Sequence, residues 1–252
     1  MNIRDIKLGH RREFRVFGLQ RSGLHAVTNW IIASLIKEGE DQLTYLNFVN
    51  SCPDIKGNRF NMGNEMPDLP DSCRTPLDKL TGTLVLGFEE WDAARWVREL
   101  DTGVESVNVF VIRDLKDVFA SRLARLEQPK SHFSISEDTL KVWGEWMTGT
   151  DPEGNYKMLK HYRKYTPLPP NTTAVKFESW ISSEDYRKSK ATKLGIEFHN
   201  LGMDKESKHG GGSSFGKPPA PGQTRWEKYR EHPMMKEFMR QIEGGNPLPY
   251  YI

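Results

Sequence analysis

A glycine-bounded loop, FGLQRSGLH at residues 17–25, constrains this chain more than any other feature of its sequence. An apolar run at residues 15–19 leads into the loop and predicts a strand, and residues 26–37 follow with apolar side chains at helical spacing. A Gly-x4-Gly segment between a strand and a helix points backbone N–H groups and the positive end of the helix toward an anion. We therefore expect this loop to hold the phosphate end of a nucleotide, although a tight turn with an incidental arginine would look similar.

The loop lacks two residues that nucleoside-triphosphate-binding loops need. In the pattern G-x-x-x-x-G-K-[ST], the lysine reaches the outer phosphates and the hydroxyl binds magnesium. Here these positions hold Leu24 and His25, and the cation, Arg21, lies inside the loop. This arrangement favours an anionic group that is transferred without magnesium, so we expect no metal site.

Four further apolar runs predict strands, at residues 43–49, 83–88, 107–112 and 173–177. Helical patterns lie at residues 92–100, from about Leu115 to about Tyr165, and in a lysine-rich stretch after residue 177. Near-continuous apolar strands that alternate with helices are typical of a parallel sheet that is covered on both faces. We expect a single α/β domain over residues 1–252, with a central parallel sheet of about five strands and helices on both faces.

Two segments interrupt this pattern. Residues 50–76 are rich in Asn, Pro, Asp and Gly, and connections of this length are often functional. Residues 208–223, KHGGGSSFGKPPAPGQ, are incompatible with a regular element. The last stretch, RWEKYREHPMMKEFMRQI, predicts a terminal helix with a proline inside that kinks or breaks it.

Composition excludes several classes of protein. The formal net charge is +2, from 36 basic and 34 acidic side chains, which argues against nucleic-acid binding but allows a local basic pocket. No apolar run approaches the roughly 20 residues of a membrane span, and the basic N-terminus lacks the apolar part of a secretory signal. Cys52 and Cys73 are too few for a disulfide scaffold or a zinc site of their own. We expect a cytoplasmic protein that binds neither membrane nor nucleic acid.

A second candidate anion site lies in VNVFVIRDLKDVFAS, residues 107–121. Arg113 follows a strand that reads as buried, and Ser121 comes eight residues later within a predicted helix. Taken alone, Arg113 could simply pair with Asp114 or Asp117, as surface arginines often do. The order of this segment after the first loop makes a second phosphate site the better interpretation.

These motifs resemble those of the sulfotransferase superfamily, which uses 3′-phosphoadenosine 5′-phosphosulfate (PAPS) as donor. Its 5′-phosphosulfate loop reads [KR]-S-G-T-T between a strand and a helix, and Arg21-Ser22-Gly23 matches the arginine form. Leu24 and His25 replace the usual threonine pair. The resemblance implies backbone contacts to the donor at Leu24, and a side chain at His25 that donates to the 5′-phosphate or to the transferring sulfonate.

The resemblance extends from about Arg15 to Glu197 and gives the second site a role. In the family, a strand-terminal arginine and a serine at this spacing bind the 3′-phosphate that distinguishes PAPS from ordinary adenine nucleotides. Arg113 and Ser121 match those positions. The resemblance thus implies PAPS as donor, 3′,5′-adenosine bisphosphate (PAP) as product and no metal.

Family members also fold a late basic loop over the donor. The loosely matching segment here is GGGSSFGKPPAPGQTRWEKY, and residues 208–223 within it would form the donor-covering loop. Ser214, Lys217 and Arg225 are candidates for the phosphates, and Phe215 is a candidate for stacking on adenine. A Gly/Pro surface loop that is disordered without donor is the alternative.

Transfer to a hydroxyl or amine also requires a base for the acceptor proton. Family members place it after the strand that corresponds to residues 83–88, where this chain reads Glu89-Glu90. Glu89 is the first choice and Glu90 the second, because adjacent residues of a strand point in opposite directions. Both could instead favour the start of the next helix.

We therefore expect a PAPS-dependent sulfotransferase in which Arg21 and His25 neutralise charge on the transferring group and Glu89 takes the acceptor proton. Residues 50–76 are expected on the acceptor side, and the acceptor itself is not identified by any motif. The alternatives are a P-loop nucleotide kinase or phosphotransferase and a non-catalytic nucleotide-binding protein on the same fold.

Overall fold

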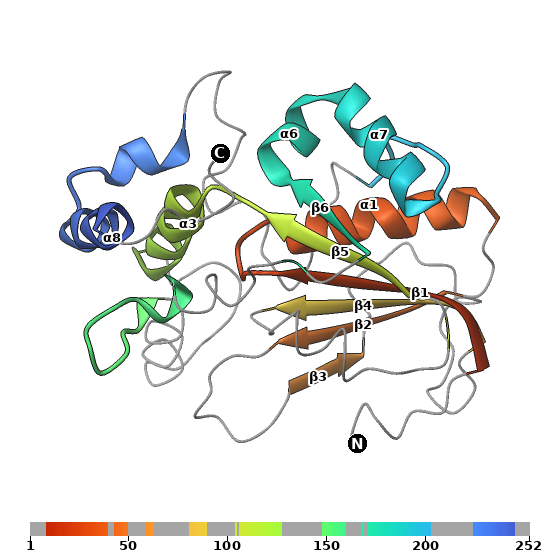
Figure 1. Cartoon of the computed structure of the whole chain (residues 1–252), viewed down its shortest axis with the longest axis horizontal. Helices are drawn as coiled ribbons and strands as arrows, with labels where there is room; N and C mark the ends of the chain where they lie inside the picture. The colour runs from red at the N-terminus through yellow and green to blue at the C-terminus, as the bar shows by residue number, and fades with distance from the viewer. Residues whose placement is uncertain are drawn as a thin grey trace.

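The computed structural model describes residues 9–39, 43–49, 59–62, 81–89, 104, 106–127, 148–159, 168, 171–202 and 224–244. These residues form a six-stranded sheet in the order β3-β2-β4-β1-β5-β6 (Figure 1). The strands are β1 (Gly9–Gly18), β2 (Leu43–Val49), β3 (Arg59–Met62), β4 (Thr81–Glu89), β5 (Ser106–Ile112) and β6 (Thr172–Lys176). All neighbouring strands are parallel except β3, which runs antiparallel to β2 at the edge.

The position of β1 in the middle of the sheet decides where a ligand can bind. From β1 the chain crosses to β2 on one side, and from β4 it crosses over β1 to β5 on the other side. The strand ends are level, because Gly18 pairs with Glu89 of β4 and with Val111 of β5. In open parallel sheets, ligands bind beyond the carboxyl ends of the strands where the winding reverses. Here that point is the end of β1.

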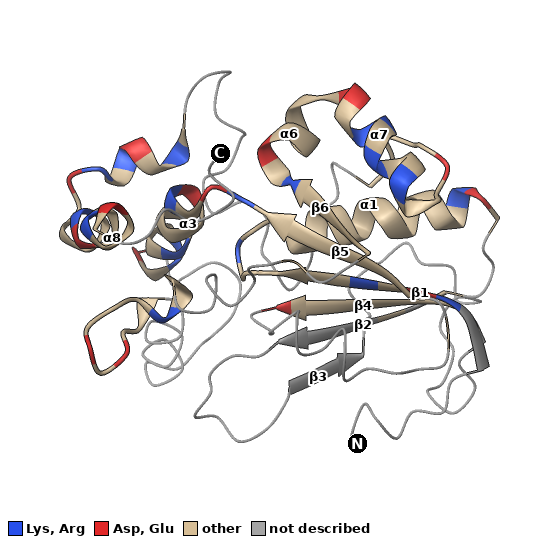
Figure 2. Ribbon diagram, viewed as in Figure 1, with Lys and Arg blue, Asp and Glu red and all other residues tan. Residues whose placement is uncertain are grey.

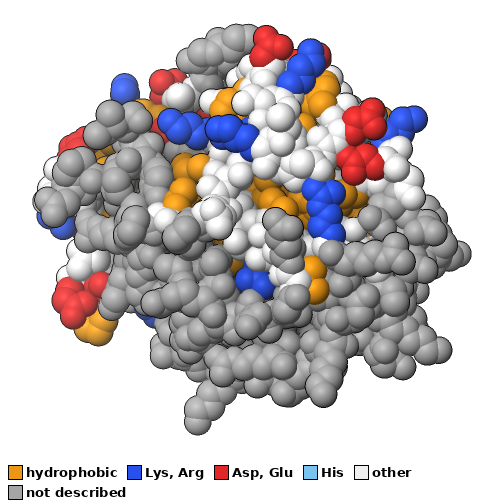
Figure 3. Space-filling view, turned by 45° about the vertical axis from the view of Figure 1, so that its right-hand side comes forward, with side chains coloured by type: hydrophobic (Ala, Val, Ile, Leu, Met, Phe, Trp, Pro, Cys, Tyr) orange, Lys and Arg blue, Asp and Glu red, His pale blue; other side chains and the backbone are white. Residues whose placement is uncertain are grey.

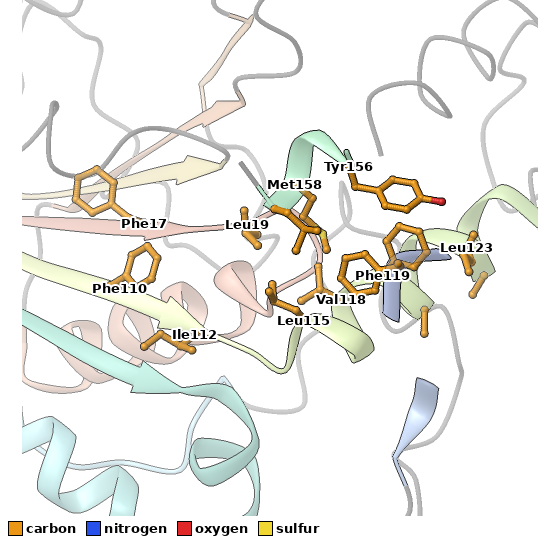
Figure 4. Close-up of a cluster of buried hydrophobic side chains, with 14 of the residues drawn as sticks. Phe17, Leu19, Phe110, Ile112, Leu115, Val118, Phe119, Leu123, Tyr156 and Met158 are labelled. Atoms are coloured by element: carbon orange, nitrogen blue, oxygen red, sulfur yellow. The ribbon is translucent and has the colours of Figure 1, made fainter. Parts of the chain in front are cut away.

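Helices pack on both faces of the sheet. They are α1 (Leu24–Lys37), α3 (Leu115–Glu127), α6 (Phe177–Ser182), α7 (Glu184–Leu194) and α8 (Pro233–Glu243). Val16, Val85 and Val109 form one apolar cluster with residues of α1, α6 and α7. Phe17 and Phe110, from the opposite face, pack with residues of α3 and α8 (Figure 4). The alternation of side chains along each strand therefore builds two separate cores.

Local sequence explains several helix boundaries. Ser183 caps α7, because its side chain accepts a hydrogen bond from the Tyr186 N–H, and Gly195 ends that helix with a left-handed φ of 63°. Pro233 opens α8, where the lack of an N–H is harmless. The predicted terminal helix is consequently broken at this proline into a 3-10 helix, η4 (Arg225–Tyr229), and α8.

The predicted fold class, a parallel α/β sheet with helices on both faces, is confirmed, and the five predicted strands correspond to β1, β2, β4, β5 and β6. Two details were wrong. Strand β3 lies within residues 50–76, which were predicted as a connection, and the expected helix is replaced around Thr150 by an antiparallel bridge to Tyr156. The predicted helix at 92–100 lies outside the described residues. None of the described helices is long and apolar enough to span a bilayer.

Candidate active site

The loop after β1 has the backbone geometry that its glycines predict. Arg21 and Gly23 have left-handed φ angles of 72° and 90°, and Gly23 directly precedes α1. A Cβ at Gly18 would lie 2.8 Å from the Ser22 Oγ, and a Cβ at Gly23 would collide with the ring of Phe177. Gly23 is therefore required by backbone conformation and close packing, whereas a side chain at Gly18 would displace the Ser22 hydroxyl. The loop delivers the first N–H groups of α1 to the end of the sheet.

Gly23→Ala is expected to lower the free energy of unfolding by more than the roughly 1–2 kcal/mol that a left-handed backbone costs a non-glycine residue. The excess comes from displacing Phe177, and thermal unfolding measures it. Gly39→Ala is the matched control, because Gly39 has a φ of 89° but open space where its Cβ would stand. Equal losses in the two variants would contradict the packing role of Gly23.

Two arginines from distant segments hold the loop from outside. The Arg122 Nη2 donates to the Gln20 carbonyl at 3.2 Å, and the Arg113 Nη1 donates to the Arg21 carbonyl at 2.7 Å. These contacts span 102 and 92 residues of sequence. The loop shape thus depends on the end of β5 and on α3 as well as on its own glycines.

The two predicted phosphate sites lie in direct contact. The Arg21 Nε donates to the Ser121 Oγ at 3.2 Å, so the first loop meets the serine of the second motif. Ser121 stands in the second turn of α3, and Arg113 precedes this helix at the end of β5. The structure therefore brings Arg21, Arg113 and Ser121 together, while their roles in binding stay predictions.

Positive charge is concentrated at this point. Burial, then Arg125 and Arg113, lower the pKa of Arg21 to about 10, with Glu89 acting in the opposite direction. Burial and then Arg225 likewise lower the pKa of Arg113. Figure 2 shows basic residues just after β1 and β5 and an acidic residue at the end of β4. On the face in Figure 3, by contrast, basic, acidic and apolar side chains of the described residues are interspersed.

A buried cluster of guanidinium groups that lower one another's pKa is stabilised by an anion. Two buried donors point to the same conclusion: among the described residues, neither the Ser22 Oγ nor the Arg113 Nε has a hydrogen-bond partner. The carboxylate of Glu178 approaches the Arg113 Nε only to 3.8 Å and accepts instead from the Asp114 N–H at 3.1 Å. The residues present therefore fit a ligand with more than one phosphate-like group.

Residues that surround Arg113 position it for such a ligand. The guanidinium lies over the ring of Phe177, with 5.1 Å between its central carbon and the ring centroid. Burial raises the pKa of Glu178, although hydrogen bonds from the backbone and the charge of Arg113 oppose this shift. The carboxylate is thus an incomplete partner for Arg113, on which the charges of Asp117 and Asp114 also act.

The start of η4 docks on α3 beside this cluster. The Trp226 N–H donates to the Asp117 Oδ1 at 3.0 Å, and the Lys116 Nζ lies 4.8 Å from the centroid of the Trp226 ring. The Tyr229 hydroxyl donates to Glu127 at 2.9 Å farther along the same helix. This docking places Arg225 close enough to Arg113 for their charges to interact.

A chain of three side chains connects β2, the first turn of α1 and the end of β4. The His25 Nε2 forms an ion-pair contact with the Glu89 Oε1, and the His25 Nδ1 lies 3.3 Å from the Tyr45 hydroxyl. Glu89 pairs with Gly18 in the sheet, so this chain adjoins the phosphate loop. Glu89, the first choice for the base, therefore lies beside the loop, and its role as the base stays a prediction.

The structure describes some of the remaining predicted site residues and not others. Ser22, Gly23 and Leu24 lie in the loop and the first turn of α1, and Arg225 lies at the start of η4. Ser214, Phe215, Lys217 and Glu90 lie outside the described residues. No group of histidine, cysteine and carboxylate side chains in the described part of the chain is suited to hold a metal ion.

Sequence reasoning missed Tyr45, Phe177, Arg122 and Arg125 as parts of this site. Only Tyr45 carried a usable signal, because it lies in a predicted strand. In the sheet it pairs with Val85, and Glu89 lies four residues beyond that partner, so the two side chains share a face. The other three reach the loop only through the packing of α3 and α6.

No protein-family model and no curated protein matches the chain. Its structure is similar to that of retinol dehydratase in complex with androsterone and the inactive cofactor PAP, with a TM-score of 0.45 and 16% identity over 92% of this chain and 80% of that one. It is also similar to mouse sulfotransferase SULT7A1 complexed with PAP, with a TM-score of 0.47 and 11% identity over 97% of this chain and 90% of that one. At such values the reaction has to be inferred from this chain's own residues.

Proposed function

We propose that the protein is a sulfotransferase that moves a sulfonate from PAPS to a hydroxyl or amine of an acceptor and leaves PAP. The observation that carries the proposal is the contact between two anion-binding motifs, Arg21 of the first loop and Ser121 beside Arg113. A ligand with phosphate-like groups at both ends of one nucleotide suits adjacent sites of this kind. Ordinary nucleoside triphosphates carry no phosphate for the second site.

The residues of the first site would bind the 5′-phosphosulfate. The N–H groups at the start of α1 and the Ser22 hydroxyl would hold its oxygens, and Arg21 would neutralise the charge that develops on the bridging oxygen as the sulfonate leaves. Arg21 stays protonated at neutral pH, because its pKa is about 10. This chemistry requires no magnesium ligand at Leu24 or His25.

The residues of the second site would bind the 3′-phosphate. Arg113 and Ser121 stand on the β5 side of the loop, and Arg225 approaches Arg113 from η4. We propose that the segment that leads into η4 covers the donor, with Ser214, Phe215 and Lys217 in contact with it. Glu89 would take the acceptor proton at the opposite side of the loop, on β4.

Ligand-induced stabilisation tests this proposal. A ligand that binds only the native state stabilises it by about 2.7 kcal/mol at 100 times its dissociation constant. We expect PAP to raise the melting temperature clearly, and magnesium ATP and 5′-AMP to have little effect. Adenosine 2′,5′-bisphosphate is the matched control, because it has the charge of PAP with one phosphate moved.

Each outcome of this experiment has a clear meaning. Stabilisation by magnesium ATP above that by PAP would refute the sulfotransferase and favour a kinase. Equal stabilisation by the 2′,5′ and 3′,5′ isomers would indicate a general anion site. A third outcome is stabilisation by PAP with no transfer of labelled sulfonate from PAPS to any acceptor in a screen of hydroxylated metabolites, glycans and peptides. That outcome would favour a nucleotide-binding protein without activity.

A further inference from the structure

Tyr45 belongs to the hydrogen-bonded chain that ends at Glu89, and no motif assigns it a role. It stands in β2 and pairs with Val85, so its side chain lies on the α1 face, as does Glu89. His25, in the first turn of α1, bridges the two through its two ring nitrogens. Residues from three separate elements thus form one continuous chain beside the phosphate loop.

His25 contacts Glu89, whose charge also acts on Arg21. Arg21 lies four residues away and belongs to a cluster with Arg113, Arg122 and Arg125, whose charges act on one another. This cluster repels a second cation, whereas the Glu89 carboxylate that His25 contacts attracts one. A neutral imidazole at this position would donate to Glu89.

A neutral imidazole gives the chain a fixed direction. An ionised carboxylate only accepts hydrogen bonds, so the His25 Nε2 carries the proton and donates to Glu89. The Nδ1 then has a lone pair and needs a donor, and the Tyr45 hydroxyl at 3.3 Å is in place to provide one. The chain runs from the Tyr45 O–H through His25 to Glu89, and neither imidazole nitrogen remains to take a proton from an acceptor.

Two of the three side chains in this chain are buried. The Glu89 side chain is 4% exposed and Tyr45 is 3% exposed, while the His25 side chain is 21% exposed. A carboxylate that accepts from a neutral imidazole keeps more of its basicity than one that is paired with an imidazolium. The protonation state of His25 therefore affects how good a base Glu89 is, and the tautomer decides whether the Nε2–H donates to it.

We propose that Tyr45 is a positioning residue for proton transfer: its hydroxyl donates to the His25 Nδ1, fixes the Nε2–H tautomer and so orients Glu89 as the base. This inference rests on the proposed sulfonate transfer. In that step the acceptor's lone pair forms the bond to sulfur and its proton passes to Glu89. The bond from sulfur to the bridging oxygen breaks, and its electron pair stays on the 5′-phosphate of PAP.

The tautomer can be measured without acceptor or turnover. In protein labelled with 15N-histidine, long-range 1H–15N correlation spectra distinguish the two neutral tautomers from the imidazolium. His25→Gln identifies the His25 signals among those of the seven histidines. We expect the Nε2–H tautomer at neutral pH in the wild-type protein; the Nδ1–H tautomer or an imidazolium would overturn the proposal without any variant at Tyr45.

Tyr45→Phe removes the hydroxyl and keeps the ring. We expect its His25 signals to move toward a mixture of tautomers, and sulfonate release from labelled PAPS to fall roughly tenfold, a fraction of what general-base catalysis contributes. Stabilisation by PAP should stay unchanged. Tyr156→Phe is the matched control, because Tyr156 is a buried tyrosine of the opposite core whose hydroxyl donates to the Met234 carbonyl, also at 3.3 Å.

These results separate the two proposals. Wild-type His25 signals and wild-type release in Tyr45→Phe would refute the role of Tyr45 while leaving the sulfotransferase intact. Absence of stabilisation by PAP in the wild-type protein would refute the sulfotransferase, whatever the tautomer. A loss of stability in Tyr45→Phe that exceeds the loss in Tyr156→Phe, with His25 signals unchanged, would assign the hydroxyl a structural role only.

Discussion

Arg21→Ala is expected to slow sulfonate transfer by roughly 10²–10³-fold, the usual loss when one donor to a developing negative charge is removed. The charge in question appears on the bridging oxygen as the bond to sulfur breaks. PAP lacks the sulfonate, so stabilisation by PAP should fall much less than the rate. Release of labelled sulfonate from PAPS measures the first quantity, and thermal unfolding measures the second.

Two controls make the Arg21 result specific. Arg21→Lys keeps the charge but loses the planar donor that reaches Ser121, and should recover part of the rate. Arg240→Ala removes an exposed arginine of α8 that pairs with Glu237 of the same helix. Neither residue belongs to the candidate site, so the rate should stay unchanged. A rate within about threefold of wild type in Arg21→Ala would exclude Arg21 from stabilising the leaving group, since removing such a donor costs far more.

Arg113→Ala should remove the preference for PAP over 5′-AMP. Hydrogen bonds to a charged group contribute about 1.5–3 kcal/mol, which corresponds to roughly 10- to 100-fold in the ratio of the two dissociation constants. Isothermal titration of both nucleotides gives that ratio directly. Arg113 also donates a hydrogen bond to the Arg21 carbonyl, and its loss weakens the binding of both nucleotides alike. The ratio of the two dissociation constants cancels this shared effect.

Ser121→Ala provides the comparison for Arg113→Ala. It removes a neutral donor from the same site and should lower the ratio by a smaller factor, about fivefold for a hydrogen bond of about 1 kcal/mol. If the ratio survives in Arg113→Ala, the 3′-phosphate is bound elsewhere. Arg225, which lies near Arg113, would then be the first residue to test.

The fold could be predicted because its central strands, β1, β4 and β5, are buried on both faces. Such strands are near-continuous apolar runs, and the alternation of these runs with helical patterns predicts the parallel sheet. Strand β3 is the exception. It lies at the edge, has four residues and reads RFNM, so it carries neither a long apolar run nor a clear alternation. Its pairing with β2 depends on contacts that a local pattern does not record.

The candidate site could be predicted in part, for a similar reason. Arg21 and Arg113 are visible because each follows a buried strand, and the ends of parallel strands meet at one edge of the sheet. The sequence does not mark Arg122 and Arg125 as site residues, because no motif around them distinguishes them from exposed arginines of a helix. Arg122 is in fact 1% exposed. Only the packing of α3 against the loop reveals its role.

The supports of the loop limit how this site could be engineered. Residues 9–37 contain the strand, the loop and the helix, so this segment alone would seem sufficient to transfer the candidate phosphate loop to another protein. However, the carbonyls of Gln20 and Arg21 are held by Arg122 and Arg113, which a transplanted segment would leave behind. The left-handed backbone at Arg21 is costly for a residue other than glycine, and it would then lose the hydrogen bonds that hold the loop in this conformation. The smallest unit that can be moved to another scaffold includes β5 and α3.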